Sequence, residues 1–150
     1  MAQISYTTIL KAVKQVIEED ADVRRLEPRV EANAPIPVDL DRPFIVVYEG
    51  RRDPSSGQDL ADGTRTRYVV TWEVQVHCFS AESYADAGEQ RDEALGAVEI
   101  ALMRKRNLGG ALADSSLMLR GGPLGGGAGP QGGFVSSGGL SISVEAVAST

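Results

Sequence analysis

The sequence predicts an α+β fold, a mainly antiparallel four-stranded sheet with two helices packed on one face. Apolar residues recur at helical spacing in two segments and alternate with polar residues in two others. Prolines, glycines and other turn-forming residues separate these segments. We therefore expect the order α-β-β-α-β-β and, for a chain of 150 residues, a single domain spanning residues 1–150.

The first helix is expected between Tyr6 and Glu19. Its apolar residues fall on one side of a helix, and Asp20–Asp22 is expected to end it. Prolines then stand at positions 28, 35 and 37. Because proline cannot continue a helix or a central strand, residues 26–41 are expected to form a loop or short extended pieces.

Two strands are expected next, joined by a long hairpin connection. Phe44–Tyr48 is rich in β-branched and aromatic residues, which is typical of a strand. Arg65–Phe79 alternates strictly, so its even-numbered residues are expected to face a core. Residues 49–66 hold turn sequences and are expected to be a loop. Most odd-numbered residues of the second strand should face water or a partner, among them Glu73, Gln75 and His77.

The second helix is expected to begin after Ser83. The Ser83 side chain can accept a hydrogen bond from the backbone N–H of Asp86. The Asp86 side chain can in turn accept one from the backbone N–H of Ser83, as in a capping box. Asn107 and Gly109 are expected to stop it. The apolar stripe is Tyr84, Ala87, Ala94, Leu95, Val98, Ala101 and Leu102, and the basic last turn is Arg104, Lys105 and Arg106.

The last two strands are expected at Ser116–Arg120 and Leu140–Val147. Of the 17 glycines, ten lie between Gly121 and Gly139, so the excess is confined to one segment. We expect this segment, residues 121–139, to be a long flexible connection between the two strands.

Composition excludes several classes of protein. The formal net charge is -6 and the arginine clusters are short, which argues against binding of duplex DNA through its phosphates. Cys78 is the single cysteine, so a disulfide scaffold is excluded. The first residues lack the pattern of a signal peptide, and no apolar run is long enough to span a bilayer. We therefore expect a soluble protein made in the cytoplasm.

The sequence patterns that could carry chemistry each lack a feature that the chemistry requires. Gly127–Gly132 matches G-x-G-x-x-G, but no helix or P-loop lysine follows it. His77 is the only histidine and lacks a second ligand, so a hydrogen-bonded surface histidine is expected. Cys78 falls on the core side, and the carboxylates before and within the second helix lack EF-hand spacing. We therefore expect no catalytic residue, no metal and no cofactor.

The remaining features predict a protein that acts through its surfaces. Glu73 and Gln75 lie on the expected outer face of the sheet, and two long connections are expected to project from it. Between Gly121 and Thr150 the only ionisable side chain is Glu145. An uncharged segment of this length would fit a role in which it becomes ordered by packing against neighbouring subunits.

The order of elements resembles that of the tail terminator (tail completion) proteins of long-tailed phages and related gene-transfer particles. The resemblance rests on "PFIVVYE", "YVVTWEVQVHCFS" and "SYADAGEQRDEALGAVEIAL", and it covers residues 4 to 147. It implies a structural virion protein of the tail neck, made in the host cytoplasm. Such proteins form a hexameric ring that caps the head-proximal end of the tail tube and offers a docking surface to the head.

The resemblance implies three partners: further copies of this chain, the tail tube protein and a head-tail connector or stopper. DNA would pass through the lumen without specific binding, and no membrane is involved. Hypothetical contact residues are the arginines of the first hairpin, the outer sheet face and the glycine segment. They are Arg51, Arg52, Arg65, Arg67, Glu73, Gln75, Gly125, Gly127, Gly129 and Gly132.

Two alternatives stay open. The first is another neck component, such as a head-tail stopper. The second is a small ligand-binding α+β domain that dimerises through its sheet. The latter requires a concave pocket with convergent polar groups, which the sequence does not indicate.

Overall fold

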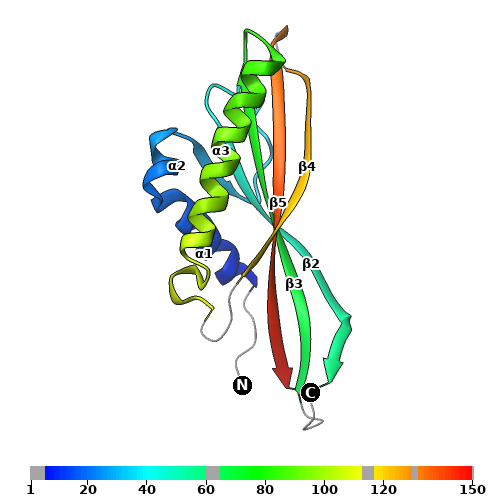
Figure 1. The fold of residues 1–150 in the computed structure, drawn as a ribbon. Helices are drawn as coiled ribbons and strands as arrows, with labels where there is room; N and C mark the ends of the chain where they lie inside the picture. Colours follow the sequence, from blue (N-terminus) through cyan, green and yellow to red (C-terminus); the bar gives the residue numbers. More distant parts are fainter. Residues whose placement is uncertain (1–5, 60–64, 113–116, 130–131, 150) are drawn as a thin grey trace.

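The computed structural model describes residues 6–59, 65–112, 117–129 and 132–149, apart from the side chains of residues 6, 51–59, 65–68, 128 and 145–149. One sheet carries the helices on one of its faces (Figure 1). The α-helices are α1 (Tyr6–Glu19), α2 (Ala21–Arg25) and α3 (Tyr84–Arg104), with a 3₁₀ turn at Leu108–Gly110. The strands are β1 (Arg29–Ala32), β2 (Phe44–Asp59), β3 (Arg65–Ser80), β4 (Met118–Ala128) and β5 (Phe134–Ser149).

The α+β class is confirmed, but the prediction of a four-stranded sheet is wrong. The sheet has five strands in the order β1-β2-β3-β5-β4. The additional strand, β1, runs parallel to β2, while the other neighbouring pairs are antiparallel. With four residues, β1 is too short to show an alternating pattern in the sequence. Its pairing with β2 is what makes it a strand.

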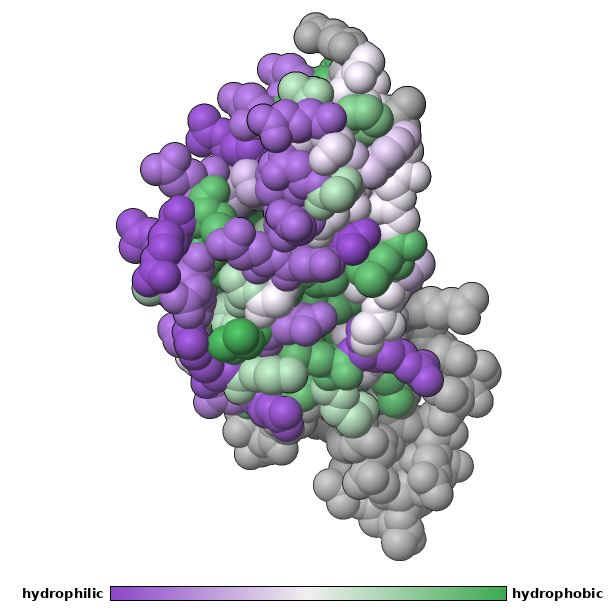
Figure 2. Space-filling model, turned by 45° about the horizontal axis from the view of Figure 1, so that its top comes forward, coloured by the Kyte–Doolittle hydropathy of each residue, from purple (hydrophilic) through white to green (hydrophobic). Residues whose placement is uncertain are grey.

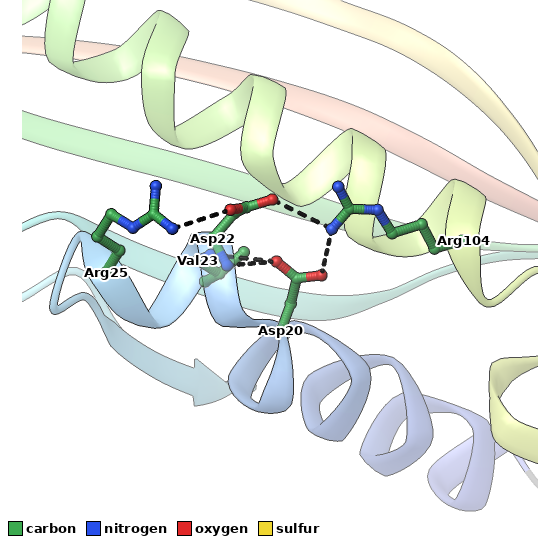
Figure 3. A network of polar contacts seen from close by, with 5 residues as sticks. All are labelled: Asp20, Asp22, Val23, Arg25 and Arg104. Atoms are coloured by element: carbon green, nitrogen blue, oxygen red, sulfur yellow. Dashed lines mark hydrogen bonds and ion pairs between the residues drawn. The ribbon is translucent and has the colours of Figure 1, made fainter.

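The first helix ends at Glu19 as predicted, but Asp20 also begins a second helix. Its carboxylate accepts hydrogen bonds from the backbone N–H groups of Asp22 and Val23, at 3.0 and 3.2 Å. Arg104, at the end of α3, donates to the carboxylates of Asp20 and Asp22, at 3.4 and 3.1 Å (Figure 3). The residues that begin α2 are therefore also joined to the C-terminal end of α3.

The start of α3 is capped by Ser83, as predicted. The Ser83 hydroxyl accepts from the Asp86 N–H at 3.1 Å. Asp86 does not complete the predicted capping box: its carboxylate accepts instead from the hydroxyl of Ser80, at 2.6 Å. The same Ser80 oxygen accepts from the N–H of Glu82, which fixes the short turn between β3 and α3.

Both predicted long loops are largely strand, so these two predictions are wrong. β2 continues to Asp59 and β3 begins at Arg65, so most of residues 49–66 belong to a paired ribbon. β4 runs through the glycines to Ala128, and β5 begins at Phe134. Glycine carries the same N–H and C=O groups as other residues, so it can pair in a sheet without a side-chain pattern that would reveal the strand. Irregularities in register fall at Gly121/Leu124, where Pro123 lies, and twice in β2.

The sheet packs apolar side chains on both faces. Trp72, Val74 and Val76 of β3 join α1 and α3 in the main core, as the alternation predicts. On the opposite face, Leu40 packs against Phe44 and Val46 in a second, smaller cluster. This second cluster arises because the connection from β1 to β2 crosses the face that the helices leave open. In Figure 1 the C-terminal parts of β2 and β5 and the N-terminal part of β3 extend beyond the helical layer.

Candidate functional site

The sheet face opposite the helices, here called the outer face, carries the polar residues that the alternation of β3 singles out. Glu73 is exposed and Gln75 is half-buried, as predicted. Across the sheet, Glu73 lies in register with Ser141 and Gln75 with Gly139. The outer face therefore combines a polar row on β3 with small residues on β5.

Two adjoining hollows lie on this outer face. One of about 350 Å³ lies over β3, β5 and the Gly122–Gly125 part of β4. The other, of about 580 Å³, is bounded by Ile36–Val38 and by the glycines of β4. The two share His77, Gly125 and Ser137 as lining residues. We call the combined depression the outer-face trough.

His77 lies where the two hollows meet, and it is buried, with 7% of its surface exposed. One ring nitrogen pairs with the Ser137 hydroxyl at 2.6 Å, the other with the Gln75 amide oxygen at 3.1 Å. Burial lowers the pKa of His77 below its ordinary value. The expectation of a hydrogen-bonded histidine is confirmed, but its placement on the surface is wrong. Nothing local in the sequence showed how closely its neighbours would enclose it.

The glycines of β4 and β5 divide into two groups according to what a side chain would meet. A Cβ on Gly122 would approach the carbonyl oxygen of Gly139 to 2.8 Å, and one on Gly126 would approach that of Val135 to 3.0 Å. These two positions need glycine because the neighbouring strand leaves no room for a side chain. At Gly125 and Gly127 a Cβ would meet nothing within 4 Å. Glycine weakens a strand and often marks close approach by another backbone or ligand, so these two positions fit an external contact.

The other two glycines that the sequence singled out lie in the turn from β4 to β5. The Gly129 N–H donates to the Gly133 carbonyl at 2.6 Å. Gly132 adopts a φ of 77°, a backbone conformation that residues other than glycine rarely take. Both therefore have a role in the turn itself.

The four arginines of the first hairpin lie along the extended ends of β2 and β3. Arg52 is in register with Val70, and Arg67 with both Gln58 and Val147. Arg51 belongs to β2 and Arg65 to β3. All four side chains lie outside the described residues, so their contact role stays a prediction.

Among the described residues that line the trough, Glu73 is the one charged side chain at neutral pH. Among the residues that the structure describes, no group of three His, Cys, Asp or Glu side chains could hold a metal ion. Cys78 is buried on the core side, as predicted. In the described part of the chain, no helix is both long and apolar enough to cross a bilayer.

Comparison with known proteins finds similarity in structure alone. No family model matches the sequence, and no curated protein matches it. A solved structure described as "Virion of native gene transfer agent (GTA) particle" contains a chain of similar fold, with a TM-score of 0.55 and 21% sequence identity. The match covers 96% of this chain and 100% of that one. A fold similar to that of this chain therefore occurs in a virion particle.

Proposed function

We propose that this chain is a structural protein of a phage or gene-transfer-agent virion, and that it acts by assembly and not by catalysis. The observation that carries the proposal is the full-length similarity in fold to a chain of a gene transfer agent virion. The outer-face trough adds support, because Gly125 and Gly127 leave backbone open to a partner where the fold itself would tolerate side chains.

The more specific proposal is a tail terminator. Copies of the chain form a ring, six by the resemblance in sequence order, at the head-proximal end of the tail tube. One face of the ring fits the last ring of tube protein, and the other does not repeat that surface, so growth stops. Contacts between copies are heterologous and close on themselves. The opposite ring face then receives the head connector, and the complex lies in the tail neck.

In this proposal the trough and the hairpin arginines serve different contacts. The trough receives an extended segment of a neighbouring protein against Gly125 and Gly127, with Glu73 and Gln75 on its polar side. Arg65 and Arg67 pair with acidic groups on the tube or on the next copy. An acidic protein also avoids holding the DNA that passes through the ring.

Electron microscopy of the purified protein, with and without tail tubes, tests the assembly. The proposal expects rings at one end of each tube and tubes of uniform length. Rings that bind the head connector but leave tube length unchanged would favour the stopper alternative. A stable dimer holding a small molecule in the trough would replace the proposal with the ligand-binding alternative.

Substitution of Gly125 and Gly127 by valine tests the trough. Because a Cβ at either position meets nothing within 4 Å, the isolated variant should fold with an unchanged or higher melting temperature. It should nevertheless fail to terminate tails. Gly88→Ala, a substitution into open space on α3, is the matched control and should assemble normally. Normal tails from the valine variant would remove the trough from the proposal.

A further inference from the structure

Ser137, His77 and Gln75 form a directed chain of hydrogen bonds on the outer face. His77 Nδ1 lies 2.6 Å from the Ser137 hydroxyl oxygen, and His77 Nε2 lies 3.1 Å from the Gln75 amide oxygen. An amide oxygen only accepts hydrogen bonds, so the proton of the neutral ring lies on Nε2. Nδ1 is then the acceptor, and the Ser137 hydroxyl donates to it. The chain therefore presents a serine hydroxyl to an imidazole nitrogen that can take its proton.

The sheet fixes the order of these three residues. His77 of β3 and Ser137 of β5 are partners in register, so their side chains lie beside each other on one face. Gln75 lies two residues before His77 and therefore on the same face. Burial lowers the pKa of His77, so the ring is neutral at neutral pH and able to accept a proton. The same burial disfavours the charged ring, which makes His77 a weak base.

The Ser137 hydroxyl has open space beside it. Ser137 lines both hollows of the outer-face trough. Its partner in register on β4 is Gly125, where a Cβ would meet nothing within 4 Å. Along β5 the next residue on the same face is Gly139. Two of the positions around Ser137 therefore carry no side chain, which leaves the hydroxyl open to a small molecule in the trough.

The trough favours an uncharged, apolar reactant. Leu124 is 59% exposed at one hollow, and the exposed side chains of Ile36 and Val38 bound the other. The carboxylate of Glu73, which also lines the trough, repels anions. Figure 2 shows hydrophilic surface over the helices and mostly neutral surface, drawn white, along the upper right-hand edge where β4 lies in Figure 1. An apolar molecule therefore meets little charge on its way to the trough.

We propose that Ser137 is a nucleophile that takes up an acyl group from an activated ester of an apolar carboxylic acid. The Ser137 Oγ forms a bond to the carbonyl carbon while its proton passes to Nδ1 of His77. The bond from that carbon to the leaving alcohol then breaks, and the alcohol takes the proton from Nδ1. Gln75 is a positioning residue, because it holds the other ring proton on Nε2. Since His77 is a weak base, the ester needs a good leaving group.

This single acyl transfer rests on three side chains and not on assembly. A chain that terminates tails but is not acylated at Ser137 would overturn this inference alone. A chain that is acylated at Ser137 but leaves tail length unchanged would overturn the proposed function alone. The two proposals share the trough and fail separately.

Peptide mass mapping of the full chain after incubation with p-nitrophenyl butyrate tests the proposal. Ser137 should carry the butyryl group. Ser141 is the internal control, because it lines the same trough on β5 but has Glu73 and not a histidine as its partner in register on β3. His77→Gln should slow acylation of Ser137 by about a hundredfold, as expected for the loss of a general base. Acylation of Ser137 that is no faster than that of Ser141 would overturn the proposal.

Two substitutions of Gln75 and one of Gly125 test positioning and access. Gln75→Leu removes the acceptor for the Nε2 proton and should slow acylation of Ser137 about tenfold or more, because the ring is no longer held in this tautomer. Gln75→Glu keeps an acceptor and should retain the wild-type rate. Gly125→Val should block acylation by covering the hydroxyl, and thermal unfolding shows whether each variant is folded. Equal rates in the two Gln75 variants, or an unchanged rate in Gly125→Val, would contradict the proposed arrangement.

Discussion

The guanidinium of Arg91 donates to the Ser136 hydroxyl at 2.9 Å, which joins helix α3 to strand β5. The same Ser136 hydroxyl donates to the carbonyl of Gly125 at 3.2 Å. One serine therefore connects the helical layer, a central strand and the glycine-rich edge strand. Because Gly125 lines the trough, this connection also sets the position of the site.

Replacing Ser136 with alanine should destabilise the protein by about 1–2 kcal/mol, because Ser136 is buried and its loss leaves the Gly125 carbonyl and Arg91 short of a partner. Urea unfolding measures the loss. A Ser137→Ala variant breaks the bond to His77 but not this connection, so amide exchange in β4 should rise in the Ser136 variant alone. Equal exchange in both variants would contradict the connecting role.

Gly122 and Gly125 should respond in opposite ways to alanine. Gly122→Ala should cost about 1–3 kcal/mol, because the new Cβ meets the backbone of Gly139 and the backbone cannot move without breaking strand pairing. Gly125→Ala should stabilise the isolated chain by about 0.5 kcal/mol, because it restricts the unfolded state at no steric cost. Thermal unfolding of the two variants checks the sign of each change. If both variants were destabilised, the fold would require glycine at position 125 as well as at position 122.

Asp20→Ala should cost more than Arg104→Ala. Asp20 caps α2 with two backbone hydrogen bonds, and loss of such a cap costs about 1–2 kcal/mol. The Arg104 side chain is 56% exposed, so solvent screens its ion pairs and its loss should cost no more than about 0.5 kcal/mol. Chemical unfolding of the two single variants gives the order. If Arg104→Ala were the more damaging, the ion pairs and not the cap would hold α2.

Stability should fall as the pH falls below the ordinary histidine pKa of 6.5. Burial lowers the pKa of His77 in the folded chain, so the unfolded chain takes up a proton first and is stabilised by it. Above this pH the His77 side chain is neutral in both the folded and the unfolded chain, so it no longer changes stability. Unfolding free energies of wild type and His77→Gln between about pH 5.5 and pH 7.5 test this, since carboxylates titrate mostly below that window. If the unfolding free energy of His77→Gln depends on pH as steeply as that of wild type, other groups cause the dependence.

Cys78 should be unreactive in the native protein. Burial raises the pKa of its thiol to about 12, an effect that the nearby charge of Arg91 reduces only in part. At about pH 8 a thiol reagent should label the unfolded chain quickly and the folded chain only as it opens. Rapid labelling without denaturant would show that β3 is exposed at Cys78.

The sequence by itself determined the elements whose side chains repeat with a period. Helices α1 and α3, the Ser83 cap and the two faces of β3 follow from patterns that span several turns or residues. Glu73 and Gln75 were placed on the outer face for the same reason, since alternation in a strand needs no knowledge of its neighbours.

Only the tertiary structure decided β1, the course of β4 and the burial of His77. β1 is a strand because Arg29–Ala32 pairs with Phe44–Val47. β4 is a strand because its glycines pair with β5, and glycine has no side chain to form a pattern. The trough likewise depends on the crossing of Ile36–Val38 over a sheet formed by distant residues. These features rest on backbone pairing and long-range packing, which local periodicity does not encode.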